Sequence, residues 1–99
     1  MGIFDWLTGA SKKEQIKDFV SRGAKVIDVR SAAEFKAGNA KNSINITLDK
    51  IQMQLSVIKK LNSPIILVCQ SGARASAAAS ILKKNNIEVL NAGNWTYMT

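Results

Sequence analysis

The chain contains no histidine, and its 99 residues include one cysteine, Cys69, and one proline, Pro64. Without histidine, the catalytic pairs in which an imidazole activates a serine or a cysteine are excluded. A single cysteine cannot form an internal disulfide, and without a Cys/His cluster no structural zinc site is expected. One proline and six glycines leave no long linker, so this length predicts one compact domain.

Long hydrophobic runs are also missing. The start of the chain, MGIFDWLTGA, lacks basic residues, and Asp5 interrupts its apolar stretch, which is not typical of a secretory signal peptide. No window approaches the roughly 20 apolar residues of a membrane span. We therefore expect a cytoplasmic protein with no membrane contact, in which a lone thiol stays free. Residues 1–10 are expected to form an N-terminal extension, irregular or a short helix, before a single domain at 11–99.

Basic residues dominate the charge, with 14 lysines and arginines against 7 acidic residues and a net charge of +7. The lysines are spread along the whole chain, and no aromatic residues interleave with them. This distribution favours solvated lysines on helix faces, and no nucleic-acid partner is expected. A general positive potential would still attract small anions.

Apolar periodicity and turn residues predict alternating strands and helices. Strands are expected at 24–29, 43–47, 65–69 and 87–90. Helices are expected to begin at the polar N-caps Ser11, Ser31 and Asp49, the first as a capping box with Glu14, and a further helix is expected from about Arg74 to Lys84. Such alternation predicts an α/β fold with a mostly parallel central sheet and helices on both faces.

Cys69 ends the most apolar predicted strand and directly precedes a predicted helix. Ligands of such folds bind at the carboxyl ends of strands. Helix amides and the helix dipole favour a thiolate there, and Arg74 can place a two-pronged guanidinium over a bound anion. An isolated cysteine at a strand end is commonly a small buried hydrophobe, but the neighbouring Gly72 and Arg74 favour a reactive site with Cys69 as the catalytic nucleophile. The predicted substrate-binding residues are the rest of the loop: Gln70, Ser71, Gly72, Ala73 and Arg74.

Three motifs follow one another along the chain. They are VIDVRSAAEF at 26–35, VCQSGARA at 68–75 and NAGNW at 91–95. In this order and spacing they resemble the upstream motif, the active loop and the closing glycine and tryptophan of the rhodanese-like sulfurtransferases. The resemblance covers roughly residues 12–95 and implies the three-layer rhodanese-like fold.

The same resemblance implies a function for Cys69. This residue would take sulfane sulfur as a persulfide from thiosulfate or a similar small anionic donor, held by the loop amides and Arg74. Cyanide or a thiol would then accept the sulfur, and a protein thiol such as a thioredoxin-like reductant is one candidate acceptor. No metal and no organic cofactor is implied.

The chain departs from the family pattern at three places. Gly38-Asn39-Ala40 stands where the family often has glycine-histidine-isoleucine, and we expect Asn39 not to be catalytic. Gln70 is neutral where a basic residue is common, and Ala92 replaces a second glycine.

The charged residues of the upstream motif have a structural interpretation. Asp28 is expected to accept backbone amides at a strand end, and Arg30 and Glu34 are expected to pair at helical spacing. The functional alternative makes Asp28 an acid or a base. Trp95 is interpreted as a cover for the core and not as a platform for substrate.

Two other functions remain open at this point. A thiolate-based phosphatase or arsenate-handling enzyme would use the same cysteine and arginine, and a non-catalytic binding module would keep only the fold. Four residues separate Cys69 from Arg74, one fewer than is usual in cysteine-dependent phosphatases, which favours sulfur over phosphoryl transfer. The intact Cys69 and Arg74 count against the binding module.

Overall fold

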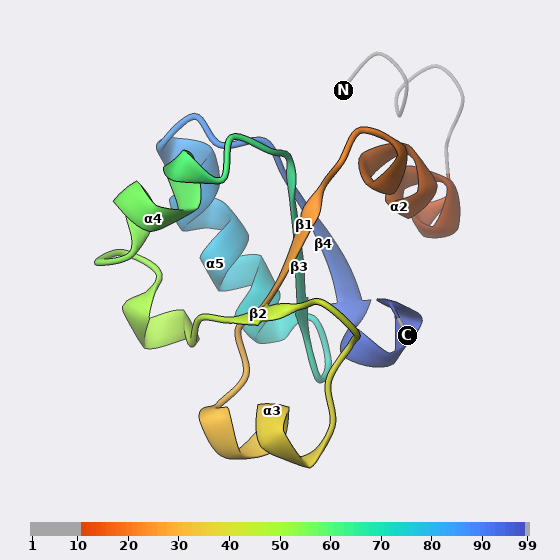
Figure 1. Cartoon of the computed structure of the whole chain (residues 1–99), viewed down its shortest axis with the longest axis vertical. Helices are drawn as coiled ribbons and strands as arrows, with labels where there is room; N and C mark the ends of the chain where they lie inside the picture. The colour runs from red at the N-terminus through yellow and green to blue at the C-terminus, as the bar shows by residue number, and fades with distance from the viewer. Residues whose placement is uncertain (1–10, 99) are drawn as a thin grey trace.

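The computed structural model describes residues 11–98 and contains one parallel β-sheet (Figure 1). Its strands lie in the order β2–β1–β3–β4, and each neighbouring pair is parallel. The strands are β1 (Lys25–Asp28), β2 (Ile44–Asn45), β3 (Ile65–Cys69) and β4 (Val89–Asn94). The predicted α/β fold with a parallel central sheet is confirmed.

Helices cover both faces of this sheet. They are α2 (Lys12–Ser21), α3 (Ala32–Ala37), α4 (Leu55–Lys60) and α5 (Ala73–Lys84), with the 3₁₀ turns η1 (Leu48–Lys50) and η2 (Trp95–Met98). In Figure 1, α4 and α5 lie on one side of the sheet and α2 lies on the other. None of the helices within residues 11–98 is both long and apolar enough to cross a membrane.

The central strand β3 contributes to both hydrophobic cores. All five of its residues are buried, and they alternate between the two faces as a strand requires. Ile65, Leu67 and Cys69 pack in the core beneath α5, whereas Ile66 and Val68 pack in the core that contains Phe19 of α2. Cys69 therefore lies at the end of the strand, on the face that α5 covers.

Two helices begin with the same capping box. Ser11 at the start of α2 and Ser31 at the start of α3 each accept an N–H bond from a glutamate three residues later, and that glutamate's carboxylate accepts the serine N–H. Both predicted N-caps are confirmed. The capping box satisfies backbone amides that have no partner within the helix.

The prediction that a helix begins at Asp49 is wrong. The segment first forms η1, with Thr47 as the preceding cap residue, and α4 begins only after Gln54. The Asp49 carboxylate accepts a hydrogen bond from the Thr47 hydroxyl, at 2.6 Å, and caps no helix. The amide of Leu48 instead donates to the backbone carbonyl of Val29, which ties this segment to the sheet.

The last strand lies further along the chain than the predicted 87–90. It spans Val89–Asn94, and its register against β3 shifts between Leu67 and Val68. Gly93, in the left-handed region at φ 85°, lies within this irregular part. An apolar pattern does not reveal the second half of this strand, because it contains asparagines and a glycine. The predicted N-terminal extension, residues 1–10, lies outside the described residues.

Candidate active site

The thiol of Cys69 meets backbone amides at the start of α5. Its Sγ accepts the N–H of Gly72 at 2.9 Å and lies 3.5 Å from the amide nitrogen of Ala75. Since α5 spans 12 residues from Ala73, the sulfur lies at the positive end of a helix. Amides directed at the sulfur stabilise negative charge on it or on an atom bound to it.

The loop turns at Gly72, which adopts the left-handed conformation at φ 96°. A side chain other than glycine would be strained there. A Cβ at this position would also lie 3.6 Å from the Cα of Gly93, because the loop packs against the irregular end of β4. The glycine therefore allows the chain to present its own amide to Cys69.

Two asparagines of β4 hold the loop in place. The Asn91 side chain donates to the Gly72 carbonyl at 2.9 Å and accepts the Gly93 N–H at 2.9 Å. The Asn94 side chain donates to the Gln70 carbonyl, also at 2.9 Å. Sequence reasoning assigned neither residue, although polar side chains inside a motif that follows a buried strand were a visible signal.

Arg74 joins α5 to α3 through Glu34. Its Nη1 and Nη2 lie 2.7 Å and 3.1 Å from the two carboxylate oxygens of Glu34, so both terminal nitrogens of the guanidinium are bound to this carboxylate. The hydrogen bond from Arg74, followed by those from Ser31, lowers the pKa of Glu34 to about 2, and the same contact raises the pKa of Arg74. The predicted pair of Arg30 with Glu34 is wrong, because Arg30 precedes the N-cap Ser31 and helical spacing does not apply to it.

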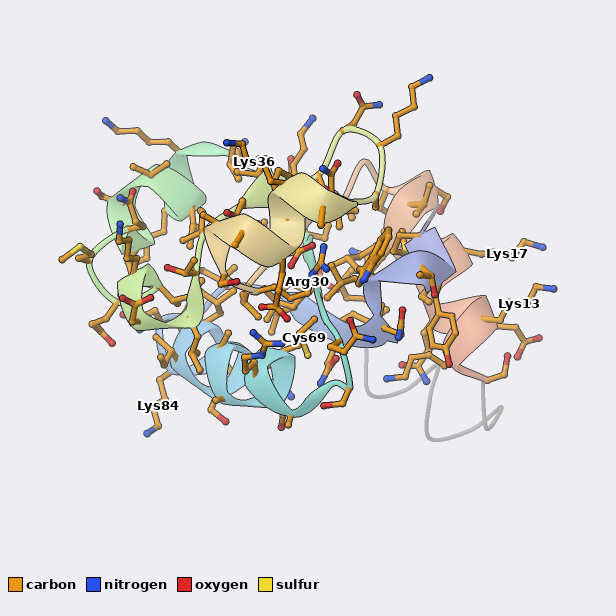
Figure 2. All side chains as sticks on the ribbon, turned by 90° about the horizontal axis from the view of Figure 1, so that it is seen from below. Lys13, Lys17, Arg30, Lys36, Cys69 and Lys84 are labelled. Atoms are coloured by element: carbon orange, nitrogen blue, oxygen red, sulfur yellow. The ribbon has the colours of Figure 1, made fainter. Side chains whose placement is uncertain are left out.

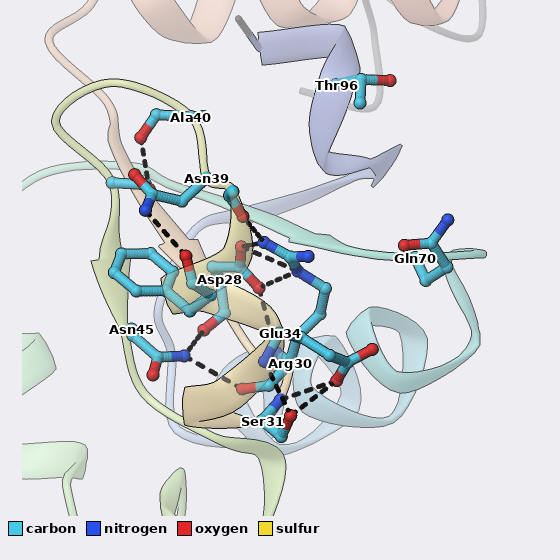
Figure 3. Close-up of polar contacts among 12 residues, drawn as sticks. Asp28, Arg30, Ser31, Glu34, Asn39, Ala40, Asn45, Gln70 and Thr96 are labelled. Atoms are coloured by element: carbon cyan, nitrogen blue, oxygen red, sulfur yellow. Dashed lines mark hydrogen bonds and ion pairs between the residues drawn. The ribbon is translucent and has the colours of Figure 1, made fainter.

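Arg30 instead forms a buried ion pair with Asp28. Its Nη2 lies 2.7 Å from Asp28 Oδ2 and donates to the Gly38 carbonyl at 2.7 Å (Figure 3). Its guanidinium lies 4.6 Å from the centre of the Trp95 ring. Asp28 also accepts the backbone N–H of Arg30 at 3.0 Å, as predicted for a strand-end acceptor. Trp95 packs against the core beside α2, which confirms its interpretation as a cover.

Two further asparagines stabilise the segments around this ion pair. Asn39 donates its side-chain amide to the Phe35 carbonyl at the end of α3, at 2.8 Å. Asn45 donates to the carbonyls of Asp28 and Arg30, both at 3.0 Å, and so ties β2 to the end of β1 (Figure 3). Asn39 thus has a structural contact, and the expectation that it is not catalytic stays a prediction.

Open space lies on two sides of the loop. A cavity of about 590 Å³ is bordered by Arg74, Ser31 and Lys50, and one of about 380 Å³ is bordered by Ser71 and Gly72. Cys69 lines neither cavity, and none of its surface is exposed. Reaction at its sulfur therefore requires a movement of the residues that cover it.

The surroundings of the loop contain scattered cations and no metal cluster. Viewed from below, the labelled lysines point outward on different sides of the molecule, and Cys69 lies between α3 and the start of α5 (Figure 2). This fits the interpretation of solvated lysines. Across residues 11–98, no three histidine, cysteine or acidic side chains lie close enough together to hold a metal ion.

Comparison with known proteins places the chain in a family. The family model of the rhodanese-like domain matches residues 8–96. No curated protein matches the chain.

Solved structures share the fold. Reduced CoADR-RHD from Bacillus anthracis is 32% identical over 87% of this chain, with a TM-score of 0.72, and this chain spans 15% of that protein's length. A rhodanese-like domain protein from Staphylococcus aureus is 25% identical, with a TM-score of 0.72 and coverage of 87% of this chain and 85% of its own. Human single-domain sulfurtransferase TSTD1 is 23% identical, with a TM-score of 0.58 and coverage of 83% and 87%. The family match over most of the sequence shows that this chain belongs to the rhodanese-like domain family.

Proposed function

We propose that the protein is a sulfurtransferase that carries sulfane sulfur as a persulfide on Cys69. The observation that carries this proposal is the position of the Cys69 sulfur, 2.9 Å from the Gly72 amide and 3.5 Å from that of Ala75, at the start of α5. Membership of the rhodanese-like family and the fold shared with a human single-domain sulfurtransferase support the same chemistry.

The first half-reaction loads the cysteine. The Cys69 thiolate attacks the outer sulfur of thiosulfate, so that a bond forms between Sγ and that sulfur while the sulfur–sulfur bond of the donor breaks. Sulfite leaves with the electron pair of the broken bond. The loop amides and Arg74 stabilise the negative charge of the donor and of the persulfide.

The second half-reaction unloads it. A thiolate or cyanide attacks the outer sulfur of the persulfide, and Cys69 leaves as a thiolate, ready for the next cycle. The products are the persulfide of the acceptor or thiocyanate. The chemistry needs no external oxidant, because one sulfur atom passes between nucleophiles and the difficult transfer is split into two steps.

The test is the intact mass of the protein after incubation with thiosulfate. We expect an increase by one sulfur atom that dithiothreitol reverses, and thiocyanate formation when cyanide is added. Cys69→Ser is the control and should stay folded without gaining sulfur, because a serine hydroxyl without a base is not a nucleophile at neutral pH. An unchanged mass with thiosulfate and with organic thiosulfonates would refute the proposal.

An aryl phosphate assay separates this function from the phosphatase alternative. The wild type should show no hydrolysis of aryl phosphates that depends on Cys69. Efficient Cys69-dependent hydrolysis, without sulfur transfer, would favour the phosphatase.

A further inference from the structure

The arginine that follows the Cys69 loop already has both of its terminal nitrogens bound to a carboxylate. Arg74 is the cation that the proposed function assigns to the donor anion, yet both of its prongs contact Glu34, at 2.7 Å and 3.1 Å. The two side chains belong to different elements, α5 and α3, and each is partly exposed, 38% for Arg74 and 37% for Glu34. An anion that approaches Arg74 therefore meets a carboxylate in the same place.

We propose that Glu34 is a specificity-determining residue, which makes the site favour sulfur donors with a single negative charge over small dianions. This inference rests on the proposed function and deepens it. The preferred donors are then organic sulfane compounds of the thiosulfonate or persulfide type, and inorganic thiosulfate is a poorer donor.

The preference follows from competition between like charges. A donor must displace the Glu34 carboxylate from Arg74 in order to bind there. The displaced carboxylate then stays close to the bound donor. Contact with Arg74 and Ser31 holds the pKa of Glu34 near 2, and its ordinary value is 4.5, so the carboxylate remains charged at neutral pH in either state. Repulsion between Glu34 and the donor grows with the charge of the donor.

Other charged groups around Arg74 do not replace Glu34 in this role. Lys50 borders the same cavity and attracts every anion. Asp28 is engaged by Arg30 in the buried ion pair, and Asp49 accepts the Thr47 hydroxyl. Glu34 is the acidic side chain in direct contact with Arg74.

Glu34→Gln isolates this charge without removing the helix cap. Glutamine supports a capping box as glutamate does, so its side-chain oxygen can still accept the Ser31 amide. Glu14→Gln is a matched control, because Glu14 forms the same capping box with Ser11 in α2, on the face of the sheet opposite α5, which carries Arg74 (Figure 1). Both variants change the net charge equally, and only Glu34→Gln removes a negative charge from the group that Arg74 contacts.

The experiment measures steady-state sulfur transfer from thiosulfate, a dianion, and from benzenethiosulfonate, a monoanion. In Glu34→Gln, the KM for thiosulfate should fall about tenfold and the KM for benzenethiosulfonate about threefold, with kcat changed by less than about twofold. Glu34→Asp keeps the charge and should retain the preference for the monoanion. Glu14→Gln should retain the wild-type KM ratio. An unchanged KM ratio in Glu34→Gln, or an equal change in Glu14→Gln, would overturn the inference.

Alkylation of Cys69 distinguishes a failure of this inference from a failure of the proposed function. Iodoacetate is an anion and iodoacetamide is neutral, and their rates can be compared even if the protein transfers no sulfur. In Glu34→Gln the rate ratio of iodoacetate to iodoacetamide should rise by about fivefold. If the ratio is unchanged, the role of Glu34 is wrong whatever the enzyme activity. If the ratio rises but the wild type transfers sulfur from neither donor, only the proposed function fails.

Discussion

Two arginine–carboxylate pairs take their carboxylates from the end of β1 and from α3, and they differ mainly in their exposure to water. In the pair of Arg30 with Asp28, the side chains are 4% and 0% exposed. In the pair of Arg74 with Glu34, they are 38% and 37% exposed. The shortest nitrogen–oxygen distance is 2.7 Å in both.

Burial, and not contact distance, therefore distinguishes the two pairs. When a buried pair is broken by removal of one partner, the other is left charged without water. Arg30 is further held by the Gly38 carbonyl and the Trp95 ring, so it has no freedom to leave. Water reaches both partners of the Arg74 pair, which is what the proposed exchange with a ligand requires.

The largest effect is expected from Arg30→Ala. This change leaves Asp28 buried without its cation and should lower the free energy of unfolding by about 3–5 kcal/mol. Urea denaturation at neutral pH would measure the loss. The added change Asp28→Asn should recover part of it, because the uncompensated charge is then gone. A loss below about 1 kcal/mol would mean that the two pairs are energetically alike.

Arg74→Lys should affect activity more than stability. Lysine keeps the charge but loses the planar fork, so kcat/KM for thiosulfate should fall by about tenfold to a hundredfold. The free energy of unfolding should change by less than about 1 kcal/mol, because the pair is partly exposed. Steady-state kinetics and urea denaturation of the same preparation measure both. Full activity in this variant would show that charge alone is sufficient at position 74.

The smallest effect is a change of stability with pH. The folded-state pKa of Glu34 is lowered from 4.5 to about 2, so the folded state binds fewer protons at this group than the unfolded state does. Its contribution is complete above about pH 4.5 and is lost as the pH falls toward 2. Urea denaturation should therefore show a stability difference between wild type and Glu34→Gln at pH 7 that shrinks by pH 3. A difference that is equal at both pH values would contradict the assignment.

Several features were predictable because their signals are local. The helix caps Ser11 and Ser31 form as predicted, the first as the predicted capping box with Glu14, whereas the capping box of Ser31 with Glu34 was not predicted. The run Ile65–Cys69 is apolar throughout and forms the buried central strand. The turn between this strand and the next helix was predicted from Gly72 and Arg74, which lie close together in the sequence. Such signals depend on backbone amides and side chains only a few residues apart.

Other features depended on packing between distant segments. The start of α4 was mispredicted because the amide of Leu48 bonds to the carbonyl of Val29, just after β1, and the residues that follow form the separate 3₁₀ turn η1. The end of β4 was missed because the strand is irregular and polar there. Its Asn91 and Asn94 hold the loop through bonds that span 19 and 24 residues, for which no local pattern exists.

The sequence by itself determined the alternating α/β order, the buried β3, and the placement of Cys69 before a helix, because periodicity and caps act within a few residues. Only the tertiary structure decided which carboxylate each arginine contacts. Glu34 and Arg74 are 40 residues apart and meet because α3 faces the start of α5 (Figure 2). Arg30 lies before the N-cap Ser31, so it is not on the face of α3 that carries Glu34. Its side chain instead pairs with Asp28 at the buried end of β1.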